Sequence, residues 1–355
     1  MPVAKATDLR LPSFEISING VALPVDAETQ MIGVRVDDDV NLPSMFTLEL
    51  TGSEHQAGES QWIDDPLFTL GNQVEIKMGY TDDLITLIVG EITGLEPEFT
   101  FNGLPRLTVR GYDRRHRLQR GRKTRTFVQK KDSDIAAQIA SEAGLGEQTE
   151  DSQVVHDYVL QANQTDLEFL QMRAQRIQYQ VVVEDKTLFF QPVANADNEI
   201  FTLTLEDDLL EFYPCLSSIG LVNEVTVRGW SFQDKKEIVG QAKKGDEVSM
   251  MGGQNSGATL VNSAFGSGIG NISNRPIMTQ AEADQLAKAQ FNQGLLALIS
   301  GEGICRGRAD LRAGKVIKIA GIGRQFSGQY YVTAASHRYG PRGYYIYFTV
   351  RRNAV

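Results

Sequence analysis

The chain has 355 residues, of which 41% are hydrophobic and 23% are charged. These values are close to the globular average and exclude a wholly disordered chain, and the length predicts two or three domains. The formal net charge of −10 argues against a general binder of nucleic acid or anionic membranes. The two cysteines, Cys215 and Cys305, exclude a disulfide-rich scaffold but leave a single bridge open.

A period of two residues dominates from Phe14 to Tyr112 and predicts about six or seven short strands. Phe14–Ile18 alternates and is followed by Asn19-Gly20, a pair that favours a tight type I′ hairpin turn. The other runs are 45–50, 74–78, 84–89, 92–100 and 107–109, with a second hairpin signal at Asn102-Gly103. Half-buried strands at this spacing are typical of an antiparallel barrel or sandwich.

The pattern then becomes helical. Asp132 or Ser133 can cap a helix that ends at Gly144, and Thr165 with Glu168 forms the capping box of a second helix. Two apolar runs, 180–183 and 187–190, follow as a hairpin. The region therefore predicts a small α/β module of about 70 residues, too small to fold securely without its neighbours.

The two-residue period returns after Ile200, with the clearest strands at 200–205, 225–230, 316–319, 330–333 and 344–350. Within this second β region, Met251 to Asn274 is rich in Gly, Ser and Asn and lacks periodicity, which predicts a long mobile loop. A capped helix follows from Thr279 to Gln293. We expect this insertion to become ordered only against a neighbour.

Candidate catalytic and metal sites are weak. Of the histidines His55, His116, His156 and His337, only His55 has a metal-ligand partner at suitable spacing, Glu59, and the polar run around this pair predicts a loop instead. His337 follows a strand, where a satisfied structural role is expected. The glycines at 266–270 have the wrong spacing for a dinucleotide fingerprint, and Gly314-Lys315 lacks the Ser or Thr of a phosphate loop.

Pairs and triplets of acids occur at 37–39, 64–65, 82–83 and 207–208. Adjacent acids at turns normally point to water, and a glycosidase needs two carboxylates that face each other. The sequence therefore predicts no catalytic residue, no cofactor and no metal.

The segment from Arg106 to Lys131 is strongly basic, with Asp113 as its only acid. It is either a solvated strand end and linker or a docking surface for an acidic neighbour, including another copy of this chain. Nucleic-acid binding is less favoured, because no aromatic platform interleaves the arginines. The candidate interface residues are Arg114, Arg115, Arg117, Arg120, Arg122, Lys123 and Arg125.

Several motifs, in order, resemble the phage late-control-D family of tail hub proteins. Residues 71–80, 90–94 and 107–118 resemble its first barrel, and Gln164–Leu170 resembles the helix start of its middle module. Residues 223–230 and 326–333, with His337, resemble its second barrel. The likeness spans residues 10 to 352 and includes the N-terminal hub part of valine-glycine repeat protein G, without the spike.

The resemblance implies a mainly β fold with an α+β insertion, in which two antiparallel β-barrel domains flank a small α/β module. The expected domains are 1–118, 119–195 and 196–355, with the loop–helix insertion at about 245–295. It implies a non-enzymatic baseplate hub of a phage tail, an extracellular injection particle or a type VI secretion system.

Such a hub is a homotrimer that joins a hexameric tail tube, or a tube-initiator protein, to a separate trimeric spike, with other baseplate components as further candidate partners. It binds no nucleic acid or membrane. The N-terminus carries no apolar run typical of a secretion signal, so it would be made in the bacterial cytoplasm and assembled into a phage virion or tail-like particle. A tail-associated cell-wall hydrolase and a peptidoglycan-binding module remain open as alternatives.

Overall fold

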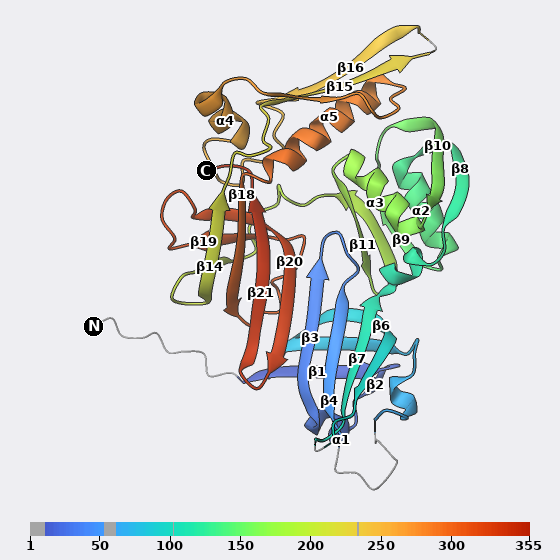
Figure 1. Cartoon of the computed structure of the whole chain (residues 1–355), viewed down its shortest axis with the longest axis vertical. Helices are drawn as coiled ribbons and strands as arrows, with labels where there is room; N and C mark the ends of the chain where they lie inside the picture. The colour runs from blue at the N-terminus through green and yellow to red at the C-terminus, as the bar shows by residue number, and fades with distance from the viewer. Residues whose placement is uncertain (1–10, 53–61, 102, 233) are drawn as a thin grey trace.

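The computed structural model describes residues 11–52, 62–101, 103–232 and 234–355 (Figure 1). The pair His55 and Glu59, and Asn102 of the second hairpin signal, lie outside the described residues. The fold is mainly β with large antiparallel sheets and an α+β insertion, which confirms the predicted fold class. No helix in the described part of the chain is long and apolar enough to cross a membrane.

The described residues of the first β region form seven strands and three short helices: β1 Pro12–Ile18, β2 Val21–Ala22, α1 Val25–Thr29, β3 Met31–Asp39, β4 Met45–Thr51, η1 Pro66–Phe68, β5 Gln73–Tyr80, β6 Asp83–Glu98, β7 Arg106–Asp113 and η2 Arg114–Gln119. The predicted β1–β2 hairpin is present, and Asn19 and Gly20 have φ values of 52° and 80°. The runs at 84–89 and 92–100, predicted as two strands, form the single strand β6.

The second β region contains β13 Thr202–Thr204, β14 Leu209–Leu216, β18 Ile299–Arg306, β19 Val316–Ala320, β20 Gly328–Gly340 and β21 Gly343–Arg352. It is joined to the first by antiparallel pairing of β3 with β20, from Asp39 opposite Ala334 to Val34 opposite Tyr339. We call this pairing the seam. It makes one 13-stranded sheet with the order β14-β18-β21-β20-β3-β4-β7-β6-β5-β1-β2, to which β19 and β13 add at β20.

One hydrophobic core serves both β regions. Val34 and Leu48 from the first region and Ile346 and Val332 from the second belong to the same buried cluster. Because burying apolar surface is the main favourable term in folding, the two regions stabilise each other as one body.

The central module contains β8 Lys123–Lys131, α2 Asp132–Glu142, β9 Gly146–Thr149, β10 Val155–Gln164, α3 Asp166–Arg176, β11 Tyr179–Glu184 and β12 Thr187–Pro192. The predicted capping box is present, because Thr165 Oγ1 accepts from the Glu168 amide and the Glu168 carboxylate accepts from the Thr165 amide. Gly144 ends α2 with φ 71°. Both helices and the hairpin pack around a separate core.

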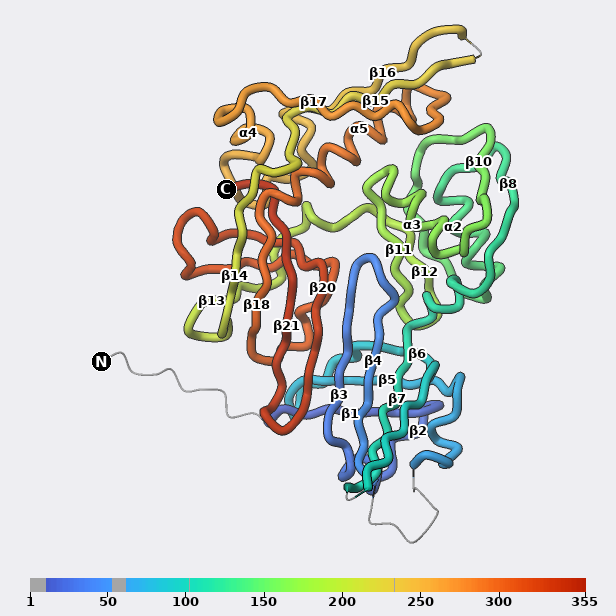
Figure 2. Tube along the Cα trace, in the orientation of Figure 1, coloured from blue at the N-terminus to red at the C-terminus, as the bar shows by residue number. Residues whose placement is uncertain are grey.

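A third layer lies beyond the ends of β18 and β21 (Figure 2). It contains β15 Glu224–Ser231, β16 Lys236–Lys243, α4 Gly257–Phe265, β17 Ile269–Ile272 and α5 Gln280–Leu295. The run at 225–230, predicted as a strand of the second β region's barrel, instead pairs with β16 and β17 in a separate sheet. Helix α5 packs so closely on this sheet that a Cβ on Gly240 would lie 2.4 Å from the backbone of Ala283.

The prediction of a long mobile loop at 251–274 is wrong. Ser256 caps α4 by accepting from the Thr259 amide, and Ala258 and Val261 of α4 are buried. The segment before α4 is held by the last residues of the chain, since the amides of Gln254 and Asn255 donate to the Val355 carbonyl at 2.7 and 2.9 Å. These backbone partners lie about a hundred residues downstream, so local composition does not reveal them.

Candidate functional site

The basic segment 106–131 lies where the first β region meets the central module. Its first half surrounds Glu91 of β6, which is buried. Arg117 Nη2 lies 2.5 Å from Glu91 Oε1, His116 Nε2 2.9 Å from Oε2, and Arg114 Nε 3.3 Å from Oε1. Burial alone would raise the pKa of Glu91, but hydrogen bonds from Arg117 and His116 and the charges of Arg117 and Arg114 outweigh it and hold the pKa below its ordinary value.

Two of the predicted interface residues are not at the surface. Arg114 also pairs with Asp185 in the β11–β12 turn, and it is 4% exposed. Arg115 is 2% exposed and donates to Asp113 Oδ2 at 2.8 Å. Both guanidiniums are buried against carboxylates of their own chain, so the structure does not place them on an exposed docking surface.

The second half of the basic segment holds β8 against α3. Lys123 Nζ lies 2.7 Å from Asp166 Oδ2, and Arg125 Nη2 lies 2.9 Å from Asp166 Oδ1. Arg122 Nη2 lies 3.0 Å from Glu168. Arg117, Arg120 and Arg122 are exposed, so these three remain candidates for contact with a partner.

A buried polar network lies at the seam. Asp38 in β3 accepts from Arg312 Nε at 2.8 Å and from Ser44 Oγ at 2.8 Å, and Ser44 Oγ in turn accepts from Arg115 Nη2 at 2.9 Å. Burial would raise the pKa of Asp38, but Arg312, Ser44 and Arg115 together hold it below its ordinary value. The acids at 37–39, predicted to be a solvated turn, are therefore part of a strand, and Asp38 is ion-paired across the seam.

His337 has the structural role that its sequence position predicts. It is buried in β20, where Nε2 lies 2.9 Å from the Leu311 carbonyl oxygen and Nδ1 lies 2.7 Å from the Tyr344 hydroxyl. Because a carbonyl only accepts, Nε2 carries the proton and Nδ1 accepts from Tyr344. Burial lowers the pKa of His337 to about 3, so the ring stays neutral.

A second charged network joins the central module to α5. Arg173 in α3 donates to Asp132 Oδ1 at 2.5 Å, and His156 Nε2 lies 3.3 Å from Asp132 Oδ2. One turn along α3, Arg176 donates to Glu282 of α5 at 2.7 Å. The third layer is therefore attached to the central module through the buried ion pair between Arg176 and Glu282.

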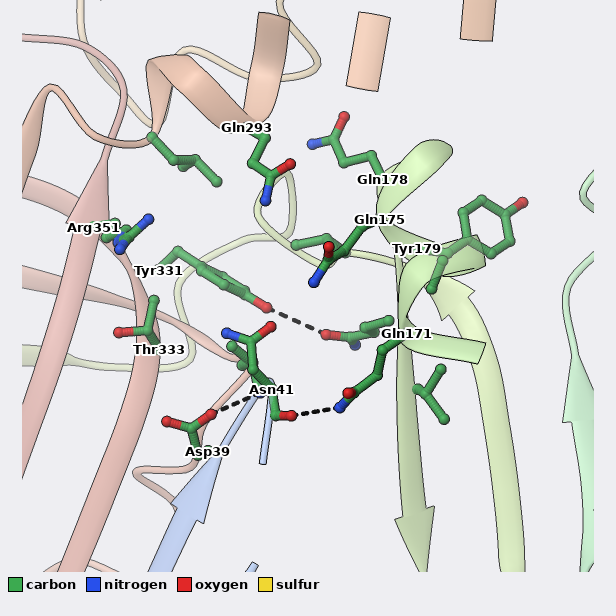
Figure 3. A pocket seen from close by; sticks show the side chains of 16 residues that line it. Asp39, Asn41, Gln171, Gln175, Gln178, Tyr179, Gln293, Tyr331, Thr333 and Arg351 are labelled. Atoms are coloured by element: carbon green, nitrogen blue, oxygen red, sulfur yellow. Dashed lines mark hydrogen bonds between the residues drawn. The ribbon is translucent and has the colours of Figure 1, made fainter. Parts of the chain in front are cut away.

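The two β regions, the central module and the third layer meet at a cavity of about 280 Å³ (Figure 3). Three glutamines line one side of it: Gln171 and Gln175 lie in α3, and Gln178 follows the end of this helix. They face Gln293 of α5 and Tyr331 of β20. The Tyr331 hydroxyl donates to Gln180 Oε1 at 3.2 Å, and Gln171 donates to the carbonyl of Asn41 in the β3–β4 loop. Amide side chains form hydrogen bonds but do not titrate, so this lining suits a polar junction better than acid–base catalysis.

The described residues offer no group of three or more His, Cys, Asp or Glu side chains that could hold a metal ion. Cys305 is buried and Cys215 is exposed, and both are free, so the single bridge left open by the sequence is not formed. Residues 266–270 lead into β17 rather than forming a nucleotide loop.

Comparison with solved structures shows the same fold in phage tail proteins. The 43 kDa tail protein of prophage MuSo2 from Shewanella oneidensis matches with a TM-score of 0.72 at 12% identity, over 96% of this chain and 98% of that one. A tail protein from Neisseria meningitidis MC58 matches with a TM-score of 0.69 at 12% identity, over 96% and 97%. The E. coli c3393 protein, a component of the type VI secretion system, gives 0.59 at 13% identity, over 96% and 77%.

By sequence, no curated protein matches the chain. The family model that does match is that of the Alg8 N-terminal domain, over residues 8–340. The expected likeness to tail proteins thus holds for the fold, whereas the family that matches is not the late-control-D family. The chain belongs to the Alg8 N-terminal domain family.

Proposed function

We propose that this protein is the structural baseplate hub of a contractile injection machine, such as a phage tail, an extracellular injection particle or a type VI secretion system. In this role it is a homotrimer that joins a hexameric tail tube, or a tube-initiator protein, to a trimeric spike. The shared fold with phage tail proteins over 96% of the chain supports this function.

The observation that carries the proposal is the seam between β3 and β20. It fixes two antiparallel β regions in one sheet around one core, so each subunit is a rigid body with two barrel-like regions. Three such subunits in a closed ring present six of these regions, which suits a ring of six tube subunits on one side and a three-fold spike on the other. The hub acts mechanically, by holding tube and spike coaxial, and catalyses no reaction.

Co-expression with the spike protein followed by mass photometry tests this function. We expect complexes that contain three copies of this chain. A single copy bound to the spike, or a stable hexamer, would contradict the proposal.

The exposed part of the basic segment is our candidate for contact between subunits. The variant Arg120→Glu should lower the fraction of trimer, because it replaces an exposed cation that would face carboxylates of the adjoining acidic subunit. Arg342→Glu changes the charge equally at an exposed turn and is the matched control. Equal trimer fractions in both variants would show that Arg120 does not lie at the contact between subunits.

A further inference from the structure

Four arginines form a row across the outer face of the 13-stranded sheet. The strands β7, β4, β3, β20, β21 and β18 lie side by side in this order (Figure 1). Thr47 of β4 pairs with Arg110 and with Arg35, and Tyr345 of β21 pairs with Arg338 and with Arg306. Arg35 and Arg338 pair directly across the seam. Residues directly opposite on neighbouring strands share a face, so we call this set the arginine row: Arg110, Arg35, Arg338 and Arg306.

The row faces outward and its charges are weakly held. The side chains of Arg35 and Arg110 are 46% and 44% exposed, and Arg306 and Arg338 are exposed. Arg35 pairs with Asp37 at 2.8 Å, and Arg110 pairs with Glu96 at 3.0 Å. Ion pairs this exposed contribute little and are screened by salt, so a partner's carboxylates can replace them. Arg306 forms no ion pair with any described residue.

The placement of Arg35 opposite Arg338 opposes folding of the isolated chain, because like charges directly opposite each other destabilise a sheet. An acidic partner would relieve this repulsion. Nucleic acid fits less well, because each strand carries a phosphate charge about every 3.4 Å along the helix axis, far more closely than the row places its cations. Tyr345, which lies in the row between Arg338 and Arg306, is half-buried, and Tyr347 beside it is covered by Arg338 at 4.2 Å.

The spacing of the row matches an α-helix. Neighbouring strands lie about 4.8 Å apart, so the successive gaps are about 10, 5 and 10 Å. One helical turn rises about 5.4 Å, so residues about 7, 11 and 18 positions after a first residue lie on the same helix face at nearly these distances. Alternate residues of an extended strand lie about 6.6 Å apart and match the gaps less well.

We propose that the arginine row binds an acidic α-helix of a partner protein, which lies across the strands and places carboxylates over the four guanidiniums. The inference does not depend on the trimeric hub, since it concerns a surface of the single chain.

Fluorescence anisotropy with two synthetic helical peptides tests the proposal. The matched peptide carries glutamates about 7, 11 and 18 residues after the first, in an alanine and glutamine background. The scrambled peptide has the same composition with its glutamates spread around the helix. We expect the full-length protein to bind the matched peptide more tightly, and the difference to shrink at high salt. Equal affinities would overturn the proposal.

The double variant Arg306→Glu with Arg338→Glu should weaken binding of the matched peptide by about tenfold or more. Neither residue pairs with a carboxylate among the described residues, so the fold should persist. The matched control is Arg324→Glu with Arg342→Glu, which makes the same charge change at exposed positions outside the row. Wild-type affinity in the row variant would refute the proposal.

Two further probes test whether the contact is direct and whether it is specific for an acidic helix. A peptide with lysines in place of the glutamates should bind the row variant better than the wild-type protein, and its failure to do so would count against a direct contact. Oligothymidylate is the competing probe. If it binds through the same arginines more tightly than the matched peptide, the row is a nucleic-acid surface and the inference fails.

Discussion

Asp38 and Arg312 form an ion pair at 2.8 Å although they lie 274 positions apart in the chain. The amide of Ala313 also donates to Asp38, at 3.2 Å. The loop before β19 is therefore attached to the end of β3, next to the hydrogen bonds of the seam. This pair holds the second β region against the first at the point where the sheet continues from one to the other.

Asp38→Asn should lower the free energy of unfolding by about 3 kcal/mol, because it leaves Arg312 without its carboxylate. Urea unfolding followed by circular dichroism measures this change. Asp207→Asn is the control, since Asp207 is exposed in the turn before β14. If both variants lose the same small amount, the ion pair does not stabilise the seam.

The protein should lose stability as the pH falls below about 4. Asp38 and Asp132 are buried, which by itself would raise the pKa of each, but their cationic partners hold both pKa values below the ordinary one. A depressed pKa in the folded state stabilises the protein above the unfolded pKa, and this stabilisation is lost as the pH falls through the folded value.

Urea midpoints at pH 5 and at pH 3 measure this loss. Asp38→Asn should show a smaller drop between the two pH values than the wild-type protein, since it lacks one of the carboxyls whose pKa is depressed. An equal drop would indicate that other carboxyls dominate the acid transition.

The imidazole of His337 should not titrate between pH 5 and pH 8, because its pKa lies at about 3. Its chemical shifts in a nitrogen–proton correlation spectrum should therefore stay constant, with the proton on Nε2. The urea-unfolded chain is the control, in which histidines titrate near their ordinary pKa of about 6.5. Movement of the His337 signals near neutral pH in the folded protein would contradict the buried hydrogen-bonded geometry.

Helix α4 should be protected from hydrogen exchange in the free protein. The Leu260 amide donates to the Ser256 carbonyl at 3.0 Å, and Ser256 forms a bridge with Ala354 near the chain end. Ser256→Ala removes the cap at a cost of about 1 kcal/mol, so exchange in 260–265 should become about fivefold faster. Ser263→Ala, at an exposed position of the same helix, is the control. Fast exchange of these amides in the wild-type protein would contradict the helix and support the mobile loop that the sequence predicts.

Local signals in the sequence were reliable where the structure depends on neighbouring residues. The capping box at Thr165 and the turn at Asn19-Gly20 each involve only a few adjacent positions, and both are present. Strand β3 was missed because it ends in three acids, and acids are depleted in strands. Asp38 can be buried there only because Arg312 reaches it from the other β region.

The candidate site shows the same limit. The basic segment is visible in the sequence, but its carboxylate partners, Glu91, Asp166 and Asp185, are scattered over neighbouring elements. The arginine row cannot be recognised in the sequence at all. Its four members come from strands spread over most of the chain and become neighbours only through the order of strands in the sheet.

The seam also has a mechanical consequence. Its strands are antiparallel, and their hydrogen bonds run perpendicular to the strand axes. A pull that drives the two β regions past each other along these axes loads all the bonds at once, in shear. A pull that peels β3 away from β20 breaks them one pair at a time. The chain should therefore resist axial thrust far better than lateral tearing, a directional stiffness that force spectroscopy along two attachment axes can measure.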